Sequence, residues 1–287
     1  MGILTKLSNR NNHPVPDEPP PSYDESESKH QKPPPQASSS SARPTSSSQH
    51  QPPAPGPSQP AQIPRQFPPT FNLYHQGWPA GAYTLGEHQN QPIYLYTVHS
   101  GLSSQPPVLL HSGPDESFPP LASAEFAFFG ASFEVELPAV PGSQAPVARE
   151  AVQAVISRGG LGTAYRFNIE VGLGGNGQRE LFEWRRSSGA AVASLGGYSY
   201  GWKLVRMARG PPGGAAGGNL DFVPGGPTDS QGNEVVATWA RGGGRSLSKA
   251  MHFQFTGTGV TGLLGERWAI MTVITALTEF QREQRRR

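Results

Sequence analysis

The stretch LLGERWAIMTVITALTEFQR, residues 263–282, decides the fold of this chain. The eleven residues between Arg267 and Glu279 carry no charge. At about 100° per residue, their apolar side chains point to nearly every side of a helix. The run is shorter than the roughly 20 residues that a bilayer requires, and charged residues close both of its ends. The sequence therefore predicts a helix that is buried on all sides by the protein preceding it.

Composition divides the 287 residues into a tail, 1–66, and a body, 67–287. The tail is rich in Pro, Ser and Gln and has almost no aliphatic residues after Leu7. It cannot bury enough apolar surface to offset its ordering entropy, so we expect it to be disordered. The body has a length that a single all-β barrel or sandwich can fill. Both parts are close to neutral, which does not favour a nucleic-acid-binding surface.

The body consists of short β-favouring runs separated by Gly and Pro. Alternation of apolar and polar residues is clearest at 133–137 and 167–171, which predicts strands with one buried face. We expect strands at 71–74, 83–86, 93–99, 108–111, 121–129, 132–137, 165–172, 180–185, 201–207, 221–223, 234–240 and 251–256. Residues 147–157, which follow Pro146, favour a short helix, and 209–219 a flexible insertion.

A peptide-recognition motif lies in the tail, at Pro20-Pro21-Ser22-Tyr23. It fits the P-P-x-Y ligand of WW domains, in which a preformed polyproline II turn docks on aromatic grooves and the tyrosine fills a second pocket. The acidic, Ser-rich run that follows offers sites where phosphorylation would tune binding. Such motifs resemble those that recruit HECT-type ubiquitin ligases, and also the late-budding motifs of viral matrix proteins.

Both ends of the chain carry features that bear on membrane contact. The C-terminus holds the polybasic cluster Arg282, Arg285, Arg286 and Arg287, which suits either the negative end of a helix or an anionic surface. The N-terminus begins like a myristoylation site, but Lys6 occupies the position that requires Ser or Thr. The chain has no cysteine and no signal-peptide core, which favours a cytosolic or nuclear protein. We expect a cytoplasmic location, with peripheral contact at membranes.

Two glycine-rich stretches match the G-x-G-x-x-G pattern of dinucleotide-binding loops. The first, 172–177, joins two strand-like runs, so a hairpin loop is the better interpretation. The second, 257–262, precedes the terminal helix, but only 25 residues remain after it, too few for the second parallel strand of that fold. We therefore expect a tight entry turn there and no nucleotide cofactor.

A hydrolase-like motif is present at Gly197-Tyr198-Ser199-Tyr200-Gly201, with Asp221, Asp229 and His252 following in the order of a catalytic triad. A nucleophile elbow needs a helix after its serine, whereas 202–206 reads as a strand. A turn is therefore favoured, and a serine hydrolase using Ser199 stays an alternative. The histidines show no metal-ligand spacing, so no metal site is predicted.

A basic surface is the remaining candidate site. Two neighbouring strand candidates, 180–185 and 201–207, carry cations. With the residue that directly follows 180–185, these cations are Arg185, Arg186, Lys203 and Arg206. If these strands pair, the four heads could bind an anionic headgroup beside Trp184 and Trp202. Glu180 and Glu183 lie among them, so a self-paired, solvated surface is the other interpretation.

The body resembles the tubby-like family, which includes the LURP-one-related proteins and the phospholipid scramblases. The resemblance rests on about twelve strands followed by one apolar C-terminal helix. Some short stretches also look like those of uncharacterised fungal proteins associated with this fold: LGEH at 85–88, FEWRR at 182–186, WKLVR at 202–206 and GLLGERWA at 262–269. The resemblance implies a closed antiparallel barrel around a central helix. It also implies membrane or phosphoinositide association for some members, transcription-linked roles for others, and no defined enzyme activity.

These observations lead to three hypotheses. The first is a monomeric, non-enzymatic adaptor with a tubby-like barrel, whose arm recruits a WW-domain protein and whose body contacts anionic phospholipid. The second is a viral matrix-type protein that assembles on membranes. The third is a serine hydrolase using Ser199.

Overall fold

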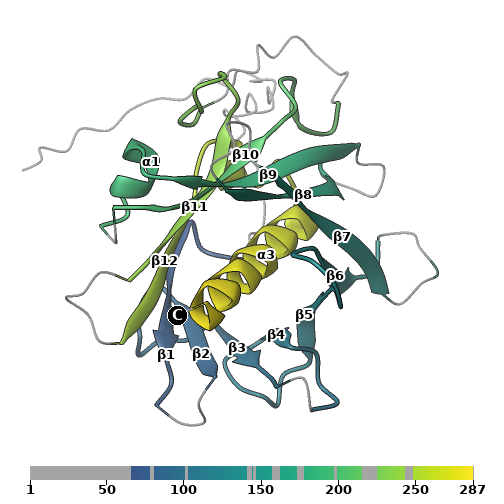
Figure 1. Ribbon diagram of the computed structural model, residues 1–287, viewed down its shortest axis with the longest axis vertical. Helices are drawn as coiled ribbons and strands as arrows, with labels where there is room; N and C mark the ends of the chain where they lie inside the picture. Colours follow the sequence, from purple (N-terminus) through teal and green to yellow (C-terminus); the bar gives the residue numbers. More distant parts are fainter. Residues whose placement is uncertain are drawn as a thin grey trace, which may run out of the picture. The chain divides into compact units, whose positions relative to one another are not determined.

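A computed structural model of the chain describes residues 66–77, 81–100, 103–140, 144, 147–156, 162–172, 178–196, 199–214, 225–242 and 248–286. The tail with Pro20-Pro21-Ser22-Tyr23 lies outside these residues. Within the described part of the chain, the protein is mainly β. A ring of strands surrounds one long helix, drawn in yellow in Figure 1. The predicted fold class is therefore confirmed.

Twelve strands are seen in the described part of the chain, and each pairs antiparallel with its neighbour in sequence. The first strand pairs with the last, through Phe71 opposite Phe253, so the sheet closes into a barrel without free edges. The strands are β1 (Thr70–His75), β2 (Ala82–Gly86), β3 (Tyr94–Val98), β4 (Val108–His111), β5 (Pro120–Phe126), β6 (Phe133–Pro138), β7 (Val147–Ile156), β8 (Thr163–Glu170), β9 (Arg179–Ser187), β10 (Gly201–Arg206), β11 (Val235–Arg241) and β12 (Lys249–Phe255).

The barrel is filled by α3 (Glu266–Arg285), the predicted helix. Residues from Trp268 to Phe280 are buried almost without interruption, so neither face of this part of the helix is turned to solvent. The Tyr96 hydroxyl donates a hydrogen bond to the carbonyl of Leu277, and Trp184 Nε1 donates one to Thr275 Oγ1 at 2.9 Å. The charge-free run thus meets apolar and hydrogen-bonding groups from the inner wall, as its composition predicted.

Glycine sets the point at which the chain turns into the barrel. A single helical turn, α2 (Thr258–Thr261), lies between Gly257 and Gly262, and both glycines have positive φ. Gly265, with φ 87°, precedes α3, and a Cβ there would lie 2.7 Å from the carbonyl oxygen of Gly172. Only glycine fits such positions without strain, so the predicted entry turn is confirmed.

The short helix predicted at 147–157 was wrong for residues 147–156, and residue 157 lies outside the described residues. Residues 147–156 form β7, in which buried Glu150 and Val152 alternate with exposed Arg149, Ala151 and Gln153. Strand pairing with β6 and β8 on either side overrides the weak helical preference of an Ala- and Glu-containing stretch. Residues 221–223, predicted as a strand, lie outside the described residues, so β7 supplies a strand that was not expected.

Smaller elements complete the wall. Helix α1 (Ala190–Ala193) lies between β9 and β10, and the 3-10 turn η1 (Pro212–Gly214) lies in the predicted insertion 209–219. Strands β8 and β9, which flank the glycine-rich stretch 172–177, pair antiparallel, and residues 173–177 themselves lie outside the described part of the chain. None of the helices in the described part of the chain combines the length and the apolarity needed to span a bilayer.

Candidate functional site

The end of the barrel where α3 finishes gathers arginine side chains on aromatic rings. Arg282 points into the barrel mouth, where its Nη1 donates hydrogen bonds to the Tyr165 hydroxyl at 2.8 Å and to the carbonyl of Ala131. Its guanidinium carbon lies 4.9 Å from the ring centre of Tyr165 and 5.4 Å from that of Phe133. Cation–π contacts with these rings therefore help to hold this arginine in the barrel mouth.

Further arginines line the same end. Arg285 lies over Phe126 at 5.0 Å, and Arg241 lies over Phe280 at 5.8 Å while its Nη2 donates to Gln284 Oε1 at 3.0 Å. Arg186 lies over Trp202 at 5.3 Å. We call this end of the barrel the C-terminal rim, formed by Phe126, Arg186, Arg241, Arg282, Arg285 and Arg286.

Two carboxylates oppose these cations. Glu283 accepts hydrogen bonds from Arg186 Nη2 at 3.0 Å and from Trp202 Nε1 at 2.9 Å. Glu279 is only 1% exposed, and its burial raises the pKa of this carboxyl to about 8, although Arg282 lies 3.7 Å away. Glu279 is therefore mostly uncharged near pH 7, and the rim carries a surplus of positive charge.

The basic patch predicted from Arg185, Arg186, Lys203 and Arg206 does not form, although β9 and β10 do pair. Arg206 faces the barrel interior, is 1% exposed and donates hydrogen bonds to Glu180 from Nε at 2.6 Å and from Nη2 at 2.9 Å. Arg185 is ion-paired with Glu183 and with Asp229. Alternate residues of a strand point to opposite faces, so neighbouring cations in the sequence are separated across the wall.

The four residues have separate environments as a result. Arg186 belongs to the C-terminal rim, and Arg206 lies near the opposite end of the same two strands. Lys203 stands on the outer face, opposite Arg185 in the strand register, and is partly exposed. Arg206 cannot reach a headgroup from inside the wall. The self-paired interpretation therefore describes Arg185 and Arg206, and no common anion site is built from the four.

The hydrolase alternative gains no geometric support from the described residues. Ser199 is exposed and lies two residues before β10, so a strand follows it and not the helix of a nucleophile elbow. His252 lies in β12, where burial lowers its pKa and the backbone of Leu195 is its hydrogen-bond partner. Asp229 is held by Arg185 and by the backbone N–H groups of Gln231 and Asn233.

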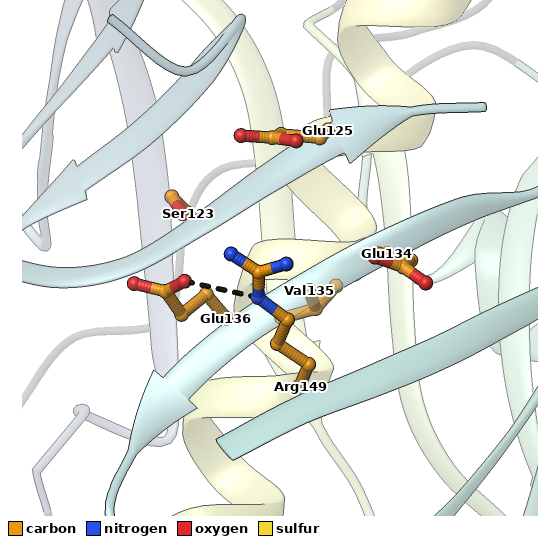
Figure 2. A pocket seen from close by; sticks show the side chains of 6 residues that line it. All are labelled: Ser123, Glu125, Glu134, Val135, Glu136 and Arg149. Atoms are coloured by element: carbon orange, nitrogen blue, oxygen red, sulfur yellow. Dashed lines mark ion pairs between the residues drawn. The ribbon is translucent and has the colours of Figure 1, made fainter. Parts of the chain in front are cut away.

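A shallow hollow on the outer wall carries acidic residues (Figure 2). In the register of β5, β6 and β7, Glu125 stands opposite Glu134 and Glu136 opposite Arg149, which forms an ion pair with it at 3.4 Å. Among the described residues, no group of three or more acidic, histidine or cysteine side chains has a geometry that could hold a metal ion. The hollow therefore reads as a solvated face of the barrel.

Sequence reasoning found part of the rim and missed the rest. The polybasic C-terminus was visible, whereas Arg186 and Arg241 join it only because their strands end beside α3. The strand predicted at 121–129 ends at Phe126, so Phe128 and Phe129 leave the sheet. The glycine that follows them, Gly130, was the sequence signal for a turn, and its φ in the structure is 88°.

Comparison with known proteins adds no relative. No protein-family model, curated protein or solved structure matches the chain. The barrel around a central helix is the architecture that a tubby-like resemblance implies, while the kinship itself stays a prediction.

Proposed function

We propose that this chain is a non-enzymatic adaptor that is peripheral at membranes in the cytoplasm. In this proposal the barrel is a rigid, monomeric platform, and the arm presents Pro20-Pro21-Ser22-Tyr23 to a WW-domain protein such as a HECT-type ubiquitin ligase. The tubby-like resemblance supports the same function, since that family includes membrane-associated proteins without a defined enzyme activity.

One observation carries the proposal: a complete WW ligand lies in a tail whose composition favours disorder, ahead of a barrel whose interior is filled. Buried side chains of Trp184, Trp239 and Trp268 occupy the inside of the barrel together with α3. A filled interior favours a scaffold over a container for a ligand or substrate. The prolines of the motif reduce the entropy lost when it binds.

Tyr23→Ala tests the WW ligand in the full-length chain. The tyrosine fills its own pocket in such complexes, so we expect capture by immobilised WW domains to fall about tenfold or more. Pro33→Ala/Pro34→Ala is the matched control, because that proline run is followed by Gln36 and lacks the tyrosine. Equal capture of the wild type and the Tyr23→Ala variant would remove the adaptor proposal.

A viral matrix-type protein with a late-budding motif is the second candidate, since a basic end and an early P-P-x-Y suit it equally. It differs in self-assembly: a matrix protein forms a lattice on anionic vesicles, whereas a monomeric barrel coats them without order. Electron microscopy of vesicles incubated with the full-length chain separates the two.

A further inference from the structure

Two phenylalanines at the tip of the turn between β5 and β6 are almost fully exposed. Phe128 is 93% and Phe129 84% exposed, and their rings contact only each other edge-to-face at 4.8 Å among the ring contacts of the described residues. The turn itself is ordered by a hydrogen bond from the Ala127 N–H to the Ser132 carbonyl at 3.1 Å. A fixed backbone thus holds two large apolar side chains in water, which marks an interaction surface.

The turn lies against the C-terminal rim. Arg282 donates to the carbonyl of Ala131 within the turn, and both Arg282 and Arg285 lie over Phe126, where β5 ends. Ser132 Oγ accepts a hydrogen bond from the Ala154 N–H of β7 at 3.1 Å. The two residues that flank the tip, Phe126 and Ala131, therefore contact the arginines directly.

A third exposed apolar residue stands at the same end. Phe133 is opposite Val152, so β7 continues four residues past the start of β6 before it ends at Ile156. Ile156 is 83% exposed. Exposed apolar side chains from the β5–β6 turn and from the last residue of β7 thus lie at the end of the barrel that carries the rim arginines.

We propose that this end docks on an anionic phospholipid membrane, with Phe128 and Phe129 inserted at the boundary between headgroups and acyl chains. Exposed Arg285 and Arg286 then face the lipid phosphates. The five arginines of the rim outnumber the acids at this end, Glu279, Glu283, Glu125 and Glu134, so charge complementarity selects the anionic membrane as the partner. This inference rests on the membrane association in the proposed function, and adds the surface and the mode of contact. A second copy of the chain would explain the phenylalanines alone but would bring like charges together.

Vesicle flotation of the full-length chain tests the docking surface. The wild type should float with vesicles of phosphatidylcholine and phosphatidylserine, and much less with pure phosphatidylcholine. Phe128→Ser/Phe129→Ser should lower the bound fraction about tenfold, and Arg285→Gln/Arg286→Gln should lower it about tenfold and remove much of its salt dependence. Two matched controls should bind like the wild type: Phe118→Ser, at the opposite end of β5, and Arg149→Gln, on the outer wall.

A labelling experiment reports insertion directly. The chain has no cysteine, so Phe129→Cys carries a single environment-sensitive dye at the tip. Its emission should shift to the blue on anionic vesicles, and a dye at Phe118→Cys should not shift.

The outcomes separate this inference from the proposed function. If the wild type floats but the phenylalanine variant floats equally well, the docking surface is wrong and membrane association stands. If the wild type does not float, both fail, while capture by WW domains still tests the adaptor independently. If light scattering shows a wild-type dimer that Phe128→Ser/Phe129→Ser converts to a monomer, the tip is a self-association surface and the membrane inference is overturned.

Discussion

The two ends of the barrel hold their arginines by different means. At the end where α3 begins, carboxylates surround the cations: Arg267 pairs with Glu150 at 2.8 Å and with Glu170 at 3.0 Å, and Arg179 pairs with both of these acids. At the end where α3 finishes, aromatic rings and a backbone carbonyl contribute most of the contacts of Arg282, and the carboxylate contacts are single ones: Arg186 with Glu283 at 3.0 Å and Arg282 with Glu279 at 3.7 Å.

This difference separates arginines that stabilise the fold through ion pairs from arginines that can still bind an anionic partner. A cation enclosed by carboxylates has its charge cancelled, whereas a cation on a ring keeps its field and its remaining N–H donors. The charges therefore cancel at the end where α3 begins, which we call the closed end. The C-terminal rim is able to attract an anionic partner. Four substitutions test this contrast, in order of expected effect.

Arg206→Ala should have the largest effect. It leaves Glu180, itself buried, without its bidentate partner, so we expect a loss of about 3–5 kcal/mol in the free energy of unfolding. Urea denaturation measures this loss. Arg149→Ala removes an ion pair on the outer wall and should cost about 0–1 kcal/mol. Similar losses in the two variants would contradict the assignment of Arg206 to the closed end.

Gly265→Ala tests the backbone contact at the start of α3. The added Cβ would meet the carbonyl oxygen of Gly172 at 2.7 Å, with φ at 87°, so we expect a loss of about 2–3 kcal/mol. Thermal unfolding checks the loss. Gly210→Ala is the matched control, since a Cβ there has no neighbour within 4 Å. An unchanged unfolding temperature for Gly265→Ala would mean that the turn tolerates a side chain.

Glu279→Gln should raise the free energy of unfolding of the protein by about 1–3 kcal/mol at pH 8 and by much less at pH 4.5. Burial raises the pKa of Glu279 from 4.5 to about 8. The nearby Arg282, Tyr165 and Arg286 lower this pKa, and Glu283 raises it. Between these values the folded chain keeps a proton that the unfolded chain releases. The contribution of Glu279 to the free energy of unfolding is fully present below pH 4.5 and is lost as the pH rises to about 8.

The pH dependence of unfolding therefore tests the state of Glu279. The free energy of unfolding of the wild type should fall across this window, and that of Glu279→Gln should fall less steeply. Parallel curves would show that Glu279 is ionised in the folded protein and that the net charge of the rim is lower by one.

Arg186→Ala should have the smallest effect, about 0–1 kcal/mol, because the side chain is nearly half exposed and Glu283 keeps its bond from Trp202. Chemical denaturation measures it. A loss as large as that of Arg206→Ala would place the rim arginines among the groups that hold the barrel together and would remove the contrast between its ends.

The sequence alone predicted the helix and most of the wall. The charge-free run 268–278 required a surrounding protein, and alternation located strands such as β6 and β8, because both signals report which residues avoid water. The strand β7 was missed because its Ala and Glu residues suit a helix equally, and only neighbours on both sides decide between them. The WW ligand stays a prediction from sequence.

The tertiary structure alone decided which charges meet. The four cations of two paired strands were divided between the two faces of the wall and between its two ends, while Arg186 and Arg241 came together with α3 from distant parts of the chain. It also turned Phe128 and Phe129 out of a predicted strand to the end that carries those arginines. Burial is recorded locally in the sequence because each residue type has its own affinity for water, whereas the meeting of charges depends on register and closure, which only the folded barrel defines.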